Sequence, residues 1–132
     1  MMYKLARYLF AVSVVMTLIG CSTDVPLNKV YGTYKASYPF GSETITLNRD
    51  DSFVQQIMIR SQASVIVRGK WDFEYYRGSR INFDGLMTVV DRFGHLKKDW
   101  QRVPPGIASF DIGRDWFRIF MASAATYPYV KQ

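Results

Sequence analysis

The chain has 132 residues, a formal net charge of +6 and 48% hydrophobic residues. This length allows one domain with a core of its own. With a single cysteine and a single histidine, the composition excludes a disulfide framework and argues against a metal site, and the scattered basic residues argue against a nucleic-acid partner.

Residues 1–20 have the organisation of a secretory signal. Lys4 and Arg7 give a positive start, and residues 9–19 are apolar except for one serine and one threonine. This run is shorter than the roughly 20 residues that span a bilayer, and it suits the core of a signal peptide. Removing this leader lowers the formal net charge to +4, because it carries two basic residues and no acidic one.

The leader ends in Leu18-Ile19-Gly20-Cys21, which resembles the lipobox of bacterial lipoproteins. The resemblance implies cleavage before Cys21 and transfer of a diacylglyceryl group to its thiol, so that acyl chains such as palmitate make the membrane a partner of the chain. In the sorting rule of that family, Ser22 permits transfer to the outer membrane. We therefore expect a lipid-anchored protein of the cell envelope, in the outer membrane and facing the periplasm. An ordinary signal peptide or a short anchor helix with a chance cysteine is the alternative.

Residues 65–76 give the clearest strand pattern, because Val65, Val67, Trp71 and Phe73 alternate with charged or exposed positions. Turn residues separate further short strands and favour an antiparallel meander. The expected strands are residues 44–47, 52–60, 80–83, 86–91, 107–112 and 116–121, and the expected turns are residues 48–51, 61–64, 77–79, 84–85, 92–94 and 113–115.

Three stretches of the chain are similar to the lipocalin-like small bacterial proteins. They are Val30-Tyr31-Gly32-Thr33-Tyr34, the hairpin Ile45-Thr46-Leu47-Asn48-Arg49-Asp50-Asp51-Ser52-Phe53, and Gly69-Lys70-Trp71-Asp72-Phe73 with the strand of residues 80–83 after it. The resemblance covers residues 30–84 and implies an up-and-down β-barrel, but it implies no particular ligand. Asp51 stands where the family usually has glycine, and aspartate tolerates the left-handed backbone region that such a turn requires.

The predicted fold is therefore all-β, an antiparallel meander closed as a small lipocalin-like barrel or half-barrel. We expect a signal peptide over residues 1–20, a lipidated tether over residues 21–29, the β domain over residues 30–122 and a loosely held tail over residues 123–132.

Residue patterns typical of catalysis are missing. His95 lies in a loop sequence and no Gly-x-Ser-x-Gly elbow accompanies it, so we interpret it as an exposed turn residue. Asp50 and Asp51 are adjacent turn formers, and Asp72 and Glu74 face Arg68 and Lys70 on one side of a strand, where cross-strand charge pairing is the expected role. We expect no enzyme, no cofactor and no metal.

Lys97, Lys98, Trp100 and Arg102 form the most distinctive cluster. One interpretation is a membrane or partner patch, with the indole at the lipid head groups and the cations on anionic lipid. The favoured alternative is a loop in which Trp100 covers the mouth of the barrel.

The sequence favours a non-enzymatic binding or interaction module at the membrane, of which an inhibitor or immunity-type lipoprotein is one subtype. Its partner would be a protein or an apolar ligand. The alternative is a lipocalin-like carrier of a small apolar molecule, which needs an internal cavity of a few hundred Å³. A core filled by Phe53, Trp71, Phe73, Phe83 and Trp116 would leave no such cavity.

Overall fold

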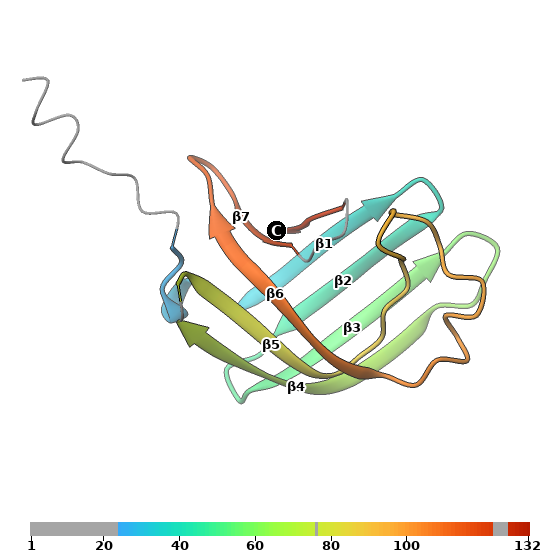
Figure 1. Ribbon diagram of the computed structural model, residues 1–132, viewed down its shortest axis with the longest axis horizontal. Helices are drawn as coiled ribbons and strands as arrows, with labels where there is room; N and C mark the ends of the chain where they lie inside the picture. The colour runs from blue at the N-terminus through green and yellow to red at the C-terminus, as the bar shows by residue number, and fades with distance from the viewer. Residues whose placement is uncertain (1–23, 76, 123–126) are drawn as a thin grey trace, which may run out of the picture.

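The computed structural model describes residues 24–75, 77–122 and 127–132, and within them eight strands form a closed antiparallel barrel (Figure 1). Each strand pairs with the next along the chain, and β8 closes the barrel by pairing with β1. The predicted all-β barrel is confirmed, in its closed form. The strands are β1 Gly32–Tyr38, β2 Gly41–Leu47, β3 Ser52–Ile59, β4 Val65–Tyr75, β5 Ser79–Leu86, β6 Gly106–Arg114, β7 Ile119–Ala122 and β8 Tyr129–Lys131.

Alternation along the strands fills the barrel interior with large side chains. Phe53 of β3 and Phe83 of β5 are fully buried and meet edge to face with ring centroids 5.1 Å apart. Phe83 meets Phe110 of β6 in the same way at 5.3 Å. Such pairs add to the free energy gained by burying the rings, because the edge of one ring is positive and the face of the other is negative.

The turn between β2 and β3 forms as predicted. Asp50 accepts hydrogen bonds from the backbone N–H of Ser52 at 3.0 Å and from its hydroxyl. Asp51 has φ 66°, which is the left-handed conformation that aspartate tolerates. The indole Nε1 of Trp71 donates to the carbonyl of Asn48 at 3.1 Å and joins this turn to β4.

The predicted turn at Asp84-Gly85 and the predicted strand over residues 86–91 are wrong. Both turn residues lie inside β5, where a β-bulge shifts the register and Gly85 has φ 95°. β5 ends at Leu86, and the β5–β6 loop, residues 87–105, is irregular apart from one isolated bridge between Val90 and Leu96. Figure 1 shows this loop at the end of the barrel opposite the N-terminal segment.

The hairpin predicted around the turn of residues 113–115 exists, but its turn lies further along the chain. β6 runs on to Arg114, and residues 115–118 form the turn that leads into β7. Trp116, the first residue of the strand predicted over residues 116–121, lies in this turn and is 86% exposed.

The described residues at both ends of the chain pack against the barrel, which is firmer attachment than we expected. The tether prediction is wrong for residues 24–29, because Val25 is buried and the short 3₁₀ helix η1, Leu27–Lys29, leads into β1. The tail prediction is wrong for β8, whose Tyr129 is buried in the core. The predicted leader, Cys21 and residues 123–126 lie outside the described residues. No helix in the described residues is long and apolar enough to cross a membrane.

Candidate functional site

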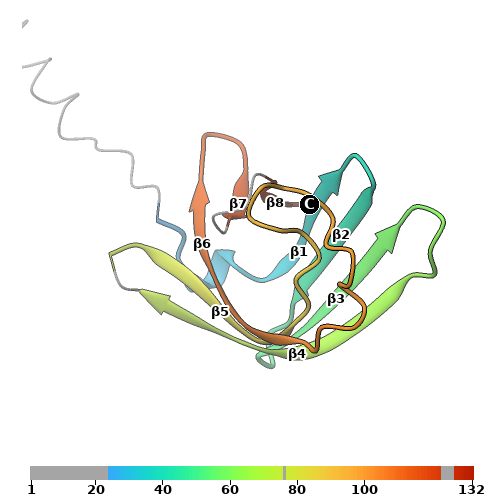
Figure 2. The same cartoon turned by 45° about the vertical axis from the view of Figure 1, so that its right-hand side comes forward.

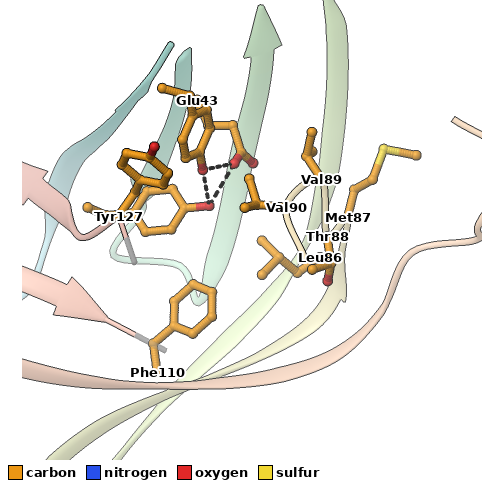
Figure 3. Close-up of a pocket in the computed structure, with 10 residues that line it drawn as sticks. Glu43, Leu86, Met87, Thr88, Val89, Val90, Phe110 and Tyr127 are labelled. Atoms are coloured by element: carbon orange, nitrogen blue, oxygen red, sulfur yellow. Dashed lines mark hydrogen bonds between the residues drawn. The ribbon is translucent and has the colours of Figure 1, made fainter. Parts of the chain in front are cut away.

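A small pocket lies inside the barrel, beneath the first residues of the β5–β6 loop (Figure 3). Its volume is about 50 Å³, which admits water-sized molecules. It is lined by Tyr38, Glu43, Leu86, Met87, Thr88, Val89, Val90, Phe110, Tyr127 and Tyr129. The apolar members come mainly from the loop, and the polar groups come from β1, β2 and β8.

Glu43 is the central polar residue of this pocket. It lies two residues before Ile45 on the inward face of β2, and its side chain is 1% exposed. One carboxylate oxygen accepts hydrogen bonds from the hydroxyls of Tyr38 and Tyr129, the latter at 3.0 Å. The other oxygen accepts from Nε2 of Gln55 at 2.7 Å. These donors replace the water that the carboxyl group loses on burial, which would otherwise cost several kcal/mol.

Burial determines how the acid and the two phenols ionise. It raises the pKa of Glu43 above the ordinary value of 4.5, and the three hydrogen bonds offset part of that rise. Burial and the neighbouring Glu43 carboxylate also raise the pKa values of Tyr38 and Tyr129. The phenols therefore stay protonated and act as donors to the carboxyl group.

Gln55 connects this pocket to the loop above it. Its Oε1 accepts from the backbone N–H of Met87 at 2.9 Å, and its Nε2 donates to the Met87 carbonyl at 2.8 Å. In a longer β5, the backbone of Met87 would bond to a neighbouring strand. Here it bonds to the side-chain amide of Gln55 instead. The chain leaves the sheet at this point, and Val89 and Val90 are buried in the same cluster as Ile57.

The structure separates the residues of the predicted basic patch. Trp100 is 3% exposed and packs in the same cluster as Ile57 and Val67, so it covers the barrel mouth as in the favoured interpretation. Lys98 and Arg102 are exposed on the outside of the loop, and Lys97 is half-buried. The interpretation that places the Trp100 indole at the lipid head groups is therefore wrong. The exposed cations Lys98 and Arg102 can still contact a partner.

The other residues considered as catalytic or metal-binding candidates do not come together in the structure. His95 is exposed in the β5–β6 loop and lies near the Asp91 carboxylate, with Nδ1 and Oδ2 3.8 Å apart. Asp91 organises that turn by accepting from the backbone N–H groups of Phe93 and His95. In the described part of the chain, no three His, Cys, Asp or Glu residues lie close enough together to hold a metal ion.

The polar residues of the pocket were not identified from the sequence. The available signal was a polar residue at an inward position of an alternating strand, which applies to Glu43 before Ile45 and to Gln55 after Phe53. The tyrosines of β1 and β8 gave no comparable signal, because a side chain with an apolar ring and a polar tip fits either face of a strand.

Searches with family models, among curated proteins and among solved structures found no match to this chain. The assignment of a function therefore depends on the geometry of the barrel and on the sequence of its leader.

Proposed function

We propose that the chain is a lipid-anchored bacterial envelope protein that acts as a non-enzymatic interaction module. The leader and Cys21 supply the anchor, and the closed barrel supplies a rigid body with one end toward the membrane and the other toward a partner.

The attachment of the N-terminal segment to the barrel is the observation that carries this proposal. The backbone N–H and carbonyl of Val25 both bond to the hydroxyl of Ser79, at 3.1 and 2.9 Å, and Asp24 accepts from the hydroxyl of Tyr75 at 2.8 Å. Three residue steps separate Asp24 from Cys21, a reach of at most about 11 Å. A lipid on Cys21 would thus hold this end of the barrel against the bilayer.

The interior pocket supports an interaction module over a carrier. Ligand sites usually measure about 300–1,000 Å³, whereas this pocket measures about 50 Å³. A buried carboxyl group would also face any apolar ligand placed there. Function is therefore better sought on the outside of the barrel.

The end that faces away from the anchor offers a basic surface, which we call the basic loop surface and define as Arg92, Phe93, Lys98 and Arg102. All four residues are exposed, and the Arg92 guanidinium lies 4.8 Å from the centre of the Phe93 ring. Residues 87–105 contain four basic and two acidic residues. This surface suits an acidic protein partner, with cations that speed encounter and an exposed ring that can be buried on binding. An inhibitor or immunity-type role is one form of such an interaction.

Two measurements on the full-length chain expressed in a bacterium test the proposal. Mass spectrometry of the N-terminal peptide should show a diacylglyceryl group on Cys21, and an unmodified Cys21 with the leader still attached would contradict the anchor. Proteins cross-linked to the native chain should be lost from Lys98→Glu/Arg102→Glu and kept by Arg68→Glu/Lys70→Glu, which makes the same change of charge on exposed positions of β4. Equal capture by both variants would rule out the basic loop surface.

A further inference from the structure

The turn between β6 and β7 exposes two large aromatic side chains side by side. Trp116 is 86% exposed and Phe117 is 96% exposed, more than any other large hydrophobic residue that the structure describes. Scattered exposed apolar residues are normal, but adjacent aromatic residues at the tip of a hairpin form a contiguous apolar surface that usually serves in binding.

The exposure of these rings follows from an ordered turn. The Asp115 carboxylate accepts from the backbone N–H groups of Phe117 at 2.9 Å and Arg118 at 2.8 Å, and the Asp115 N–H donates to the Arg118 carbonyl at 3.0 Å. The guanidinium of Arg118 returns to the same carboxylate at 3.2 Å. Asp115 thus holds the tip in one conformation that directs its two central residues away from the barrel.

This tip lies at the same end of the barrel as the N-terminal segment. β1, β8, β7 and β6 are antiparallel neighbours in that order, so the end of β6 and the start of β1 lie at one end of the barrel. An open groove at this end is lined by Asp24 and Ser79 from one side and by Gly113 and Phe120 from the other. Figure 1 shows η1 and the β6–β7 turn on the opposite side from the β5–β6 loop, and Figure 2 shows the β6–β7 turn beyond the arrowhead of β6.

We propose that Trp116 and Phe117 insert into the interface of the bilayer that carries the lipid anchor. The inference rests on the proposed lipid at Cys21, because a reach of about 11 Å from Cys21 to Asp24 brings this end of the barrel to the membrane surface. Tryptophan and phenylalanine are residues that enter the head-group region, and a second attachment strengthens the hold of a lipid anchor.

The charges around the tip suit an anionic lipid surface. The tip itself, residues 114–118, carries two arginines and one aspartate, and Arg77 and Arg80 line the groove beside it together with Asp24 and Asp111. Arg80 pairs with Asp111 at 3.4 Å and Arg118 pairs with Asp115. The arginine excess favours phosphatidylglycerol or similar head groups next to the inserted rings.

Tryptophan fluorescence can test this insertion specifically, because the three tryptophans differ in their exposure. Trp71 and Trp100 are 4% and 3% exposed, so among the three tryptophans Trp116 is the one that can meet lipid. The lipidated full-length product is reconstituted into vesicles of phosphatidylethanolamine with a minority of phosphatidylglycerol, with bromine atoms on the acyl chains. We expect the Trp116 emission to shift to shorter wavelength and to be quenched, and the quenching to disappear in Trp116→Phe.

A second measurement separates failure of this inference from failure of the anchor. Without lipid or leader, a chain that begins at Ser22 should still bind the same vesicles weakly, and Trp116→Ser/Phe117→Ser in that chain should lower the binding at least about tenfold, since two rings leave the interface. Phe93→Ser, at the other end of the barrel, is the matched control and should leave binding unchanged. Membrane-bound lipidated protein with unquenched Trp116 would overturn the inference and keep the anchor. Quenching of Trp116 in the chain that begins at Ser22, with no lipid found on native Cys21, would overturn the anchor and keep the insertion of the tip. Self-association through the tip without quenching would show that it binds a second copy instead.

Discussion

Glu43 shows how one inward residue changes the character of the barrel interior. Its neighbours on the same face of β2, Ile45 and Leu47, make ordinary apolar contacts, whereas the carboxyl group requires three donors from three other strands or loops. Those donors come from Tyr38, Gln55 and Tyr129, so one acid determines the positions of side chains up to 86 residues away in the sequence. Buried polar networks of this kind favour one arrangement of the core over others.

The raised pKa of Glu43 predicts a dependence of stability on pH. A carboxyl group whose pKa is higher in the folded state binds its proton more tightly there, so ionisation weakens folding. The penalty is absent below the ordinary pKa of 4.5, grows as the pH rises to the raised pKa, and is constant above it. Glu43→Gln cannot titrate, so the free energy of unfolding of the native chain should fall relative to this variant as the pH rises through that window.

Urea unfolding at several pH values on both sides of 4.5 measures this difference. Glu74→Gln removes the same charge from an exposed position of β4 and is the control. A pH trend that Glu74→Gln removes as fully as Glu43→Gln would contradict the role assigned to the buried acid.

At the scale of the elements, β4 lies very close to its neighbours at Gly69. Gly69 is paired with Phe53 across the β3–β4 ladder, and a Cβ at this position would lie 2.6 Å from the ring of Phe53 and 2.2 Å from the carbonyl oxygen of Asp84. Both distances are far shorter than van der Waals contact. The glycine thus lets a core aromatic ring and the bulged part of β5 come together over β4.

We expect Gly69→Ala to lower the free energy of unfolding by about 2 kcal/mol or more, because the methyl group forces backbone atoms apart. Gly106→Ala at the start of β6 is the matched control, since nothing lies within 4 Å of its added Cβ, and it should change stability by less than about 0.5 kcal/mol. Denaturant unfolding of the two variants compares them directly. Equal effects would show that loss of backbone freedom, and not crowding, governs both sites.

The elements that the sequence predicted correctly are determined by local patterns, and those that it missed are determined by contacts between distant residues. β3 and β4 combine a clear two-residue period with Asn, Asp or Ser at their ends, so local signals suffice. The chain after Leu86 carries an equally apolar sequence, but its backbone leaves the sheet and bonds instead to the side chain of Gln55, which is far away in the sequence. In the site, the position of Trp100 over the barrel mouth was anticipated, whereas the network around Glu43 depends on contacts that one strand cannot reveal.

For the whole molecule, closure of the barrel depends on β8. It pairs with β1 on one side and β7 on the other, and Tyr129 brings to the core a ring stacked on Phe110 and a hydroxyl bonded to Glu43. Without this strand, two edges would lose their partners and the acid would lose a donor.

A chain that ends at Ala122 should therefore lose at least about 3 kcal/mol of stability, the usual cost of deleting one buried aromatic side chain. Circular dichroism during urea unfolding gives the measurement. If the shortened chain does not fold, Tyr129→Phe keeps the ring and the strand, and its smaller loss reports the hydroxyl bond separately. Unfolding of the shortened chain at the same urea concentration as the full-length chain would restore the prediction of a loosely held tail.

The pairing of the first strand with the last also sets the order in which the molecule can be completed. The bond from the Lys131 ammonium to the Lys29 carbonyl joins residues that are 102 positions apart, and β1 finds its second partner in β8. Such distant pairing is slow to form, because a long stretch of chain must lose conformational entropy before the contact can stabilise it. β1 through β7 can assemble first as an open sheet, but the barrel closes only when Tyr129–Lys131 are in place to pair with both β1 and β7.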